Sequence, residues 1–284
     1  MFESAEFAAG FTGGIEGPCC DPDGVLYAVN YGREGTVGRV LPDGTADVFV
    51  ELPEGSVGNG IVLDADGTLL VADHTAHQLL RLDRDDRSVT VVATEPRMHQ
   101  PNDIAIGPDR RVYASDPDWA NDAGQLWRVD QDGSTTLLET GMGTTNGIEV
   151  SPDGRRLYVN ESVQRDVWCY DLHDDGSVSG KRPLVSFPDF AMDGMRCDVE
   201  GNVWIARWGK GTVVRVTPDG VVDHEVRLLT GSHCTNVAFG GTDGCTVHVT
   251  VADRGTVETF RVDVPGRAFT LWSRWRGKPW RPST

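Results

Sequence analysis

A segment built around an Asp-Gly type of turn recurs six times along the 284-residue chain, at intervals of 43 to 47 residues. In each copy a short apolar strand precedes the turn and a strand of period two follows it, which is the pattern of a β-hairpin. Two further short strands fit before the next copy, and this spacing is typical of propeller blades. The six segments read DPDGVLYAVN, DADGTLLVAD, GPDRRVYASD, SPDGRRLYVN, DVEGNVWIAR and GTDGCTVHVT.

The repeat predicts an all-β protein, a six-bladed β-propeller with four antiparallel strands per blade and a single domain over residues 1–284. Almost no helix is expected, because no stretch has a 3.6-residue apolar period over the length of a helix. A propeller closes by pairing its two ends. Strand-like residues occur both at 3–9 and at 268–272, and residues from about 268 to 284 are assigned as a closing strand and tail.

Composition limits the partners. The formal net charge of -17 argues against binding to nucleic acid or to an anionic membrane. No apolar run approaches the roughly 20 residues that span a bilayer, and the first residues do not resemble a signal peptide. We therefore expect a soluble, cytoplasmic protein with a small-molecule partner, as a monomer or a small homo-oligomer. The six cysteines form no CxxC pair and are expected to be reduced and mostly buried.

An oxygen-bearing side chain stands seven residues before the acidic position of every turn. The first strand of a propeller blade lines the central channel, and the turn closes that strand at its far end. The six side chains are therefore expected to begin the innermost strands and to meet at one mouth of the channel. They are Glu16, Asn59, Asn102, Asn146, Asp193 and Asn236.

This inner ring has the composition of a metal site. A single Asn often bonds only the local backbone, but two carboxylates crowded into a channel repel each other unless a cation lies between them. Glu16 and Asp193 together match the charge of a divalent ion, and Asn102 and Asn146 can add amide oxygens. An all-oxygen shell favours Ca²⁺, with Mg²⁺, Mn²⁺ and Zn²⁺ as alternatives. Asn59 is expected to face the channel and the substrate without binding the ion.

The second strand of each hairpin runs back to the same mouth and predicts an outer ring that walls the pocket. Within this ring Asp116 and Arg207 are expected to contact substrate, and Asp116 or, second to it, Asp73 is a candidate general base. The full set is Asn30, Asp73, Asp116, Asn160, Arg207 and Thr250.

Three loop residues complete the predicted pocket. Trp119 follows the end of a second strand and is expected to wall it. His99 and His233 each lie three residues before a member of the inner ring, so they occupy equivalent loops at the mouth. A histidine has a pKa near neutrality and can serve as a base or contact the substrate there.

Five segments together resemble the gluconolactonase, senescence marker protein and luciferin-regenerating enzyme family. The resemblance covers nearly the whole chain and implies a six-bladed propeller that holds one catalytic divalent cation. The segments are IEGP at 15–18, QPND at 100–103, TTNGIEVSPDGRRLYVNES at 144–162, DGMRCDVEGNVWIA at 193–206 and TNVAFGG at 235–241.

The resemblance implies that Glu16, Asn146 and Asp193 are metal ligands and that Asn102 touches substrate or metal. Asp193 is also similar to the carboxylate that the family uses as general base, so Asp193 and Asn102 are the candidate catalytic residues. The chain departs from the pattern at Gln100, where sugar-lactone members similar to it carry an Arg that holds substrate hydroxyls. Aldonolactone specificity is therefore open, and Arg207 is a candidate for the same task.

The leading hypothesis is a metal-dependent hydrolase of a lactone, in which the cation polarises the carbonyl and a base activates water. A second hypothesis is a phosphotriesterase or other esterase that uses the same site, as in propellers resembling diisopropyl fluorophosphatase and paraoxonase. A third is a non-catalytic binding propeller stabilised by its metal. Nucleophilic serine chemistry is not expected, because the chain has no GxSxG elbow.

Overall fold

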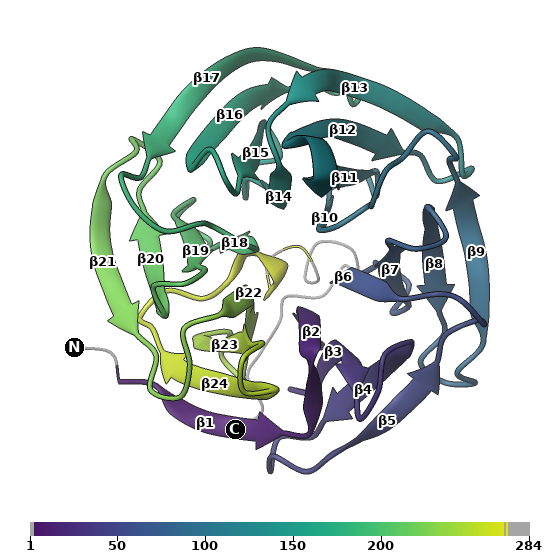
Figure 1. The fold of residues 1–284 in the computed structure, drawn as a ribbon, viewed down its shortest axis with the longest axis vertical. Coiled ribbons are helices and arrows are strands. Elements are labelled where there is room, and N and C mark those ends of the chain that lie inside the picture. Colours follow the sequence, from purple (N-terminus) through teal and green to yellow (C-terminus); the bar gives the residue numbers. More distant parts are fainter. Residues whose placement is uncertain (1–2, 270, 272–284) are drawn as a thin grey trace.

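The computed structural model describes residues 3–269 and 271. Six four-stranded antiparallel sheets stand around a central channel, which confirms the predicted six-bladed propeller (Figure 1). In five blades the first strand in sequence lies innermost and the others follow outward, and in the remaining blade the N-terminal strand of the chain is the outermost one. This arrangement brings the beginnings of six innermost strands to one region at the centre of the ring.

The first three blades follow the chain in simple order. The first blade contains β2 (Phe11–Cys20), β3 (Leu26–Tyr31), β4 (Thr36–Val40) and β5 (Ala46–Glu51). The second contains β6 (Gly58–Leu63), β7 (Leu69–Asp73), β8 (Gln78–Leu82) and β9 (Val89–Thr94). The third contains β10 (Ile104–Ile106), β11 (Val112–Asp118), β12 (Ala123–Val129) and β13 (Thr135–Met142).

The fourth and fifth blades also follow the chain in simple order, and the sixth is completed by the N-terminal strand. The fourth contains β14 (Thr145–Val150), β15 (Arg156–Glu161), β16 (Asp166–Leu172) and β17 (Val178–Ser186). The fifth contains β18 (Met195–Cys197), β19 (Val203–Arg207), β20 (Thr212–Val216) and β21 (Val222–Arg227). The sixth contains β22 (Cys234–Gly240), β23 (Thr246–Val251), β24 (Thr256–Arg261) and the N-terminal strand β1 (Ala5–Ala9).

The propeller is closed by its N-terminus. Strand β1 pairs antiparallel with β24, with Ala5 opposite Thr259, and supplies the outermost strand of the sixth blade. The chain then passes into the first blade through Gly10, whose φ of +103° favours glycine. The predicted closing strand at about 268–284 is therefore wrong where it can be checked: residues 267–269 are helical, and 270 and 272–284 lie outside the described residues.

Six apolar clusters hold the ring together, one between each pair of neighbouring blades. The cluster between the first two blades includes Val29 and Val71, and the one that joins the sixth blade to the first includes Val257 and Ile15. Alternate residues of each strand supply these contacts, so the period-two pattern of the sequence becomes a continuous core.

Helix is scarce, as predicted. Within the described residues it comprises the 3₁₀-helix η1 (Trp119–Asn121) and the helical residues 267–269 and 271. None of the described helices is long and apolar enough to cross a membrane. All six cysteines are free and buried, which confirms the expectation of reduced thiols.

Candidate functional site

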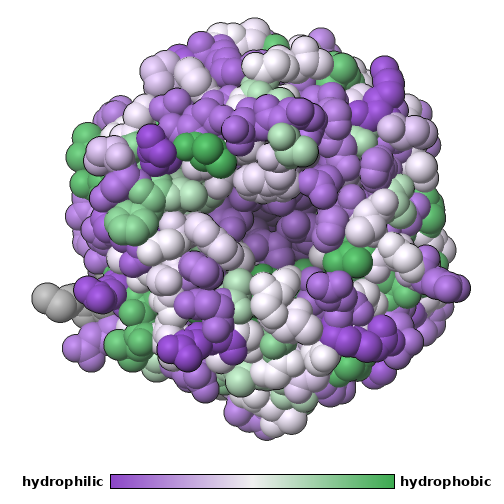
Figure 2. Space-filling view, in the orientation of Figure 1, coloured by the Kyte–Doolittle hydropathy of each residue, from purple (hydrophilic) through white to green (hydrophobic). Residues whose placement is uncertain are grey.

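A cavity of about 600 Å³ opens at one end of the channel. Figure 2 shows a hollow at the centre of one face of the molecule, and its walls are mainly hydrophilic. The beginnings of the innermost strands supply most of the polar lining. Five of the six inner-ring side chains line the cavity, namely Glu16, Asn59, Asn102, Asn146 and Asp193.

The sixth member of the ring, Asn236, is fully buried beside this group. Its Oδ1 accepts the backbone N–H of Val237 at 2.8 Å, and its side chain partly opposes the rise that burial causes in the pKa of Glu16. The seven-residue register therefore predicted a real spatial cluster, although its members differ in their contacts.

The two carboxylates of the ring are held in an unfavourable environment. Burial, and then the charge of Asp103, raises the pKa of Glu16 to about 7. Burial also raises the pKa of Asp193 well above its usual range, and the charge of Glu16 raises it further. Hydrogen bonds from Asn146 and from the backbone N–H of Gly194 oppose this shift. Two buried carboxylates that act on each other in this way would be stabilised by a cation.

Three amide oxygens of the ring also lack a hydrogen-bond partner among the described residues. They are Oδ1 of Asn59, Asn102 and Asn146, and all three are buried. A buried carbonyl oxygen without a partner costs free energy, which a water molecule or a cation would recover. The orphaned oxygens and the two carboxylates thus form a donor set made only of oxygen, and such a set fits a hard divalent cation.

The same region offers little to a metal that prefers nitrogen or sulfur. Within residues 3–269 and 271, no three His, Cys, Asp or Glu side chains are grouped so that they could hold a metal ion. A site here would consist of two carboxylates completed by amide oxygens, a combination that differs from such a triad. This composition agrees with the all-oxygen shell expected from the sequence.

The outer ring does not wall the pocket as predicted. Of its six members only Asn30 lines the cavity, and its Nδ2 donates to the carbonyl of Gly14 at 2.7 Å. Asp116 is fully buried, and its carboxylate accepts the backbone N–H groups of His99 at 2.8 Å and Gln100 at 2.7 Å. These side chains hold the loops that lead into the inner strands. Asp116 therefore does not line this cavity, and its predicted contact with substrate stays a prediction.

Asp73 and Asn160 have similar tasks in their own blades. Asp73 accepts the backbone N–H groups of Val57 and Ala76, each at 3.2 Å. Asn160 donates to the carbonyl oxygen of Asp193 at 2.6 Å. The candidate bases of the outer ring are thus occupied in binding backbone, which leaves Asp193 as the better placed carboxylate.

Arg207 also lies away from the cavity. Its side chain is almost completely buried, its guanidinium donates to the Asp189 carboxylate at 3.0 Å, and it lies 3.8 Å from the ring centre of Phe187. Burial lowers the pKa of Arg207 from its usual value. The predicted substrate-holding role for this guanidinium is therefore not supported, because its donors face Asp189.

The loop residues divide into two groups. Trp119 lines the cavity with 40% of its surface exposed, as expected for a residue that walls the pocket. His99, Gln100 and His233 do not line it. A ring nitrogen of His99 lies 2.9 Å from the side-chain amide nitrogen of Gln125, and His233 stacks on Trp208 at 4.3 Å between ring centres. Trp208 does line the cavity, so His233 lies directly behind a lining residue.

Some cavity residues were not predicted. Glu34, Ser162 and Val163 line the cavity from loops between later strands of their blades. These loops join the second and third strands and are four residues long in every blade, but their sequences differ, so no shared residue type marked them as cavity residues. His74, which directly follows Asp73 at the end of β7, also lines the cavity.

The SMP-30/gluconolactonase/LRE-like region matches residues 15–253, and the chain belongs to this family. A pentonolactonase of Haloferax volcanii is 32% identical, over 93% of this chain and 92% of its own length. A gluconolactonase of Zymomonas mobilis is 25% identical, over 79% and 72%. The crystal structure of regucalcin from Agrobacterium tumefaciens, described as a calcium-binding protein, superposes with a TM-score of 0.79 at 23% identity and covers 92% of this chain and 96% of its own.

Proposed function

We propose that this member of the SMP-30/gluconolactonase/LRE-like family hydrolyses an uncharged sugar lactone with the help of a bound divalent cation, Ca²⁺ in the first place. The observation that carries the proposal is the pairing of two buried carboxylates with three unpartnered amide oxygens in one cavity. The lactonase relatives support the lactone as the substrate class. Glu16, Asn146 and Asp193 would hold the cation, with Asn102 as a further oxygen donor.

A cation bound there would polarise the lactone carbonyl and stabilise negative charge on its oxygen. The chain itself supplies the base. Asp193 lines the cavity, whereas the carboxylates of Asp116 and Asp73 are bound to backbone N–H groups, so Asp193 is the one of the three that can accept a proton from bound water. We assign Asp193 to take the proton from the attacking water and Asn102 to orient the substrate through its amide.

The lining also bears on the charge of the substrate. Glu16, Glu34 and Asp193 are acidic, and no Arg or Lys occurs among the described residues that line the cavity. With the cation bound to Glu16 and Asp193, Glu34 still adds negative charge, and no cationic side chain of the described lining would pair with a carboxylated or sulfonated lactone. Trp119, by contrast, presents an aromatic face against which a sugar ring can pack. An uncharged pentono- or hexonolactone fits this combination of polar floor and aromatic edge.

The test is a panel of uncharged and carboxylate-bearing lactones, followed by proton release, with chelator and after return of Ca²⁺. Hydrolysis of the uncharged lactones that chelator abolishes and Ca²⁺ restores is the expected result. Glu16→Gln should weaken Ca²⁺ binding in calorimetry, whereas the matched change Asp219→Asn, at an exposed turn, should leave it unchanged. Chelator-resistant turnover, or equal Ca²⁺ affinity in Glu16→Gln, would contradict the proposal.

A further inference from the structure

A buried ion pair crosses the channel beneath the candidate site. Asp103 lies just before β10 of the third blade, and Arg196 lies in β18 of the fifth blade, so the pair joins blades that are not neighbours in the ring. Arg196 Nη1 is 2.8 Å from Asp103 Oδ2, and Arg196 Nη2 is 3.0 Å from Asp103 Oδ1. This two-pronged geometry fixes both side chains in orientation as well as in distance.

The pair is mostly buried, and Asp103 is also hydrogen-bonded to neighbouring residues. The side chain of Asp103 is 0% exposed and that of Arg196 is 12% exposed. Asp103 also accepts the backbone N–H of Ile104 at 2.9 Å, while its own N–H donates to the hydroxyl of Ser115 at 3.0 Å. Gly60 packs against it so closely that an added Cβ would lie 2.7 Å from Oδ1. Neither partner can therefore turn away to find another.

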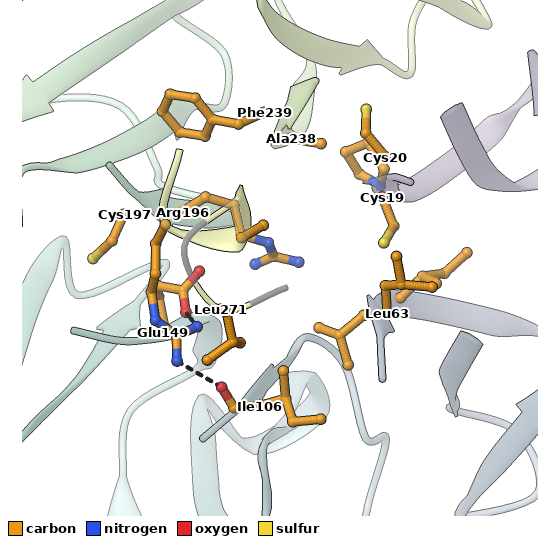
Figure 3. Close-up of a pocket in the computed structure, with 15 residues that line it drawn as sticks. Cys19, Cys20, Leu63, Ile106, Glu149, Arg196, Cys197, Ala238, Phe239 and Leu271 are labelled. Carbon is orange, nitrogen blue, oxygen red and sulfur yellow. Dashed lines mark hydrogen bonds and ion pairs between the residues drawn. The ribbon is translucent and has the colours of Figure 1, made fainter. Parts of the chain in front are cut away.

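The ion pair separates two cavities. Asp103 directly follows Asn102, which lines the candidate site, while Arg196 lines a second cavity of about 70 Å³ deeper in the channel. Figure 3 shows the guanidinium of Arg196 pointing into this inner space, with Cys19 and Leu63 on the opposite wall. A second buried pair, between Arg267 and Glu149 at 3.0 Å, lies at the same cavity.

The charges of these buried side chains determine the net charge of the candidate site. The candidate site has the carboxylates of Glu16 and Asp193, and the charge of Asp103 acts on both of them. Charges interact over long distances in a buried, poorly screened region. Arg196 cancels the charge of Asp103, and Arg267 and Glu149 cancel each other, so of these buried groups the two carboxylates of the inner ring, Glu16 and Asp193, remain for a cation at the mouth.

We propose that Asp103 and Arg196 are a positioning pair that keeps the net charge of the site at two negatives and so matches it to a divalent cation. This inference rests on the proposed function for the presence of the cation. It predicts that removal of the Asp103 charge and removal of the Arg196 charge change the affinity for Ca²⁺ in opposite directions. Loss of the Asp103 charge leaves an uncompensated guanidinium near the cation, whereas loss of the Arg196 charge leaves a third carboxylate.

The experiment is calorimetric titration of Ca²⁺ and La³⁺ into the chelator-treated protein and its variants. Asp103→Asn should weaken Ca²⁺ binding about 10- to 100-fold, the range known for groups behind metal ligands. Arg196→Gln should instead strengthen it and raise the affinity for La³⁺ relative to Ca²⁺. The double variant restores two negative charges and should return to within about twofold of the wild type. Arg196→Lys keeps the charge and should stay near the wild type.

The direction in which the Ca²⁺ affinity changes distinguishes charge balance from a purely structural role of the ion pair. A site that is merely loosened binds Ca²⁺ more weakly in both single variants and weaker still in the double variant, and that result would overturn the inference. If Arg196→Gln fails to fold, the comparison of Asp103→Asn with the double variant decides, because only charge balance makes the double variant the tighter binder. Wild-type protein that binds neither ion would overturn the proposed metal and this inference together.

Discussion

Asn160 donates a hydrogen bond from its side-chain nitrogen to the backbone carbonyl oxygen of Asp193, at 2.6 Å, and so links the fourth blade to the first residues of the fifth. The contact is tight on both sides, because an added Cβ at Gly147 would lie 2.5 Å from the same carbonyl and 2.6 Å from the Asn160 nitrogen. The position of the Asp193 carboxylate thus depends on a residue in the neighbouring blade.

We predict that Asn160→Ala lowers kcat about 10- to 100-fold with little change in KM, because a small displacement of a reacting group has an effect of this size. The measurement is steady-state hydrolysis of the best lactone of the panel. Asn202→Ala is the matched control: Asn202 is also buried and donates to Asp198 at 2.9 Å, in the hairpin turn between β18 and β19. A parallel fall in kcat in both variants would show that general loosening, and not the position of Asp193, is responsible.

The inner ring could be found from the sequence because the repeat fixes a position along a strand. Glu16, Asn102 and Asp193 share one register relative to their turns, and equivalent strands carry them to one mouth of the channel. The charge pair behind them was not found. Asp103 and Arg196 occupy different registers in their repeats and come together only because Arg196 reaches across the ring. A register gives no information about which long side chains cross the channel.

In the outer ring the register predicted the position of a side chain but not its hydrogen-bond partners. The register placed Asp116 at the correct end of its strand, but it could not reveal that two backbone N–H groups of the preceding loop point at the carboxylate. Buried carboxylates bind nearby backbone donors whenever these are available. Glu34 and Val163 line the cavity from the connections between second and third strands, which have the same length but different sequences in each blade, so no shared residue type marked them.

The closure of the propeller by β1 can be tested through protein stability, with two adjacent alanines of this strand as test and control. Ala8 is buried in the cluster that joins the sixth blade to the first, whereas Ala9 is exposed on the same strand. Ala8→Asp should lower the free energy of unfolding by about 2 kcal/mol or more, because it buries a charge without a partner. Ala9→Asp should change it by less than about 0.5 kcal/mol. Urea denaturation measures both, and equal effects would argue against closure by this strand.

His248 supplies a pH dependence that is separate from the candidate site. It lies in β23, buried, with its ring 5.0 Å from that of Phe7, and burial lowers its pKa from 6.5 to about 4. The folded protein therefore holds His248 neutral in a range where the unfolded chain protonates it. The resulting contribution to stability is complete above pH 6.5 and is lost as the pH falls from there to about 4.

We expect the free energy of unfolding to fall over this range by an amount on the order of 3 kcal/mol from His248 alone. His248→Gln should remove this part of the slope when urea unfolding is measured between pH 7 and pH 4. His173→Gln is the control at an exposed histidine and should leave the slope as in the wild type. An unchanged slope in His248→Gln would mean that this imidazole is solvated in the folded protein.

Trp119 tests the aromatic edge of the cavity. It belongs to η1, directly after β11, and exposes 40% of its surface at the cavity wall. A sugar ring packed on its face gains the contact only when bound, so Trp119→Ala should raise KM for an uncharged lactone about two- to tenfold and leave the melting temperature nearly unchanged. Trp119→Phe should retain most of the affinity.

Leu229→Ala removes a similarly apolar and even more exposed side chain, with 71% of its surface accessible, that does not line the cavity. It should alter neither KM nor stability. A larger fall in kcat than rise in KM for Trp119→Ala would place the indole near the reacting carbonyl. An unchanged KM would show that the Trp119 face does not contribute to binding, and that the other described side chains of the wall, the carboxylates and amides among them, determine which lactone binds.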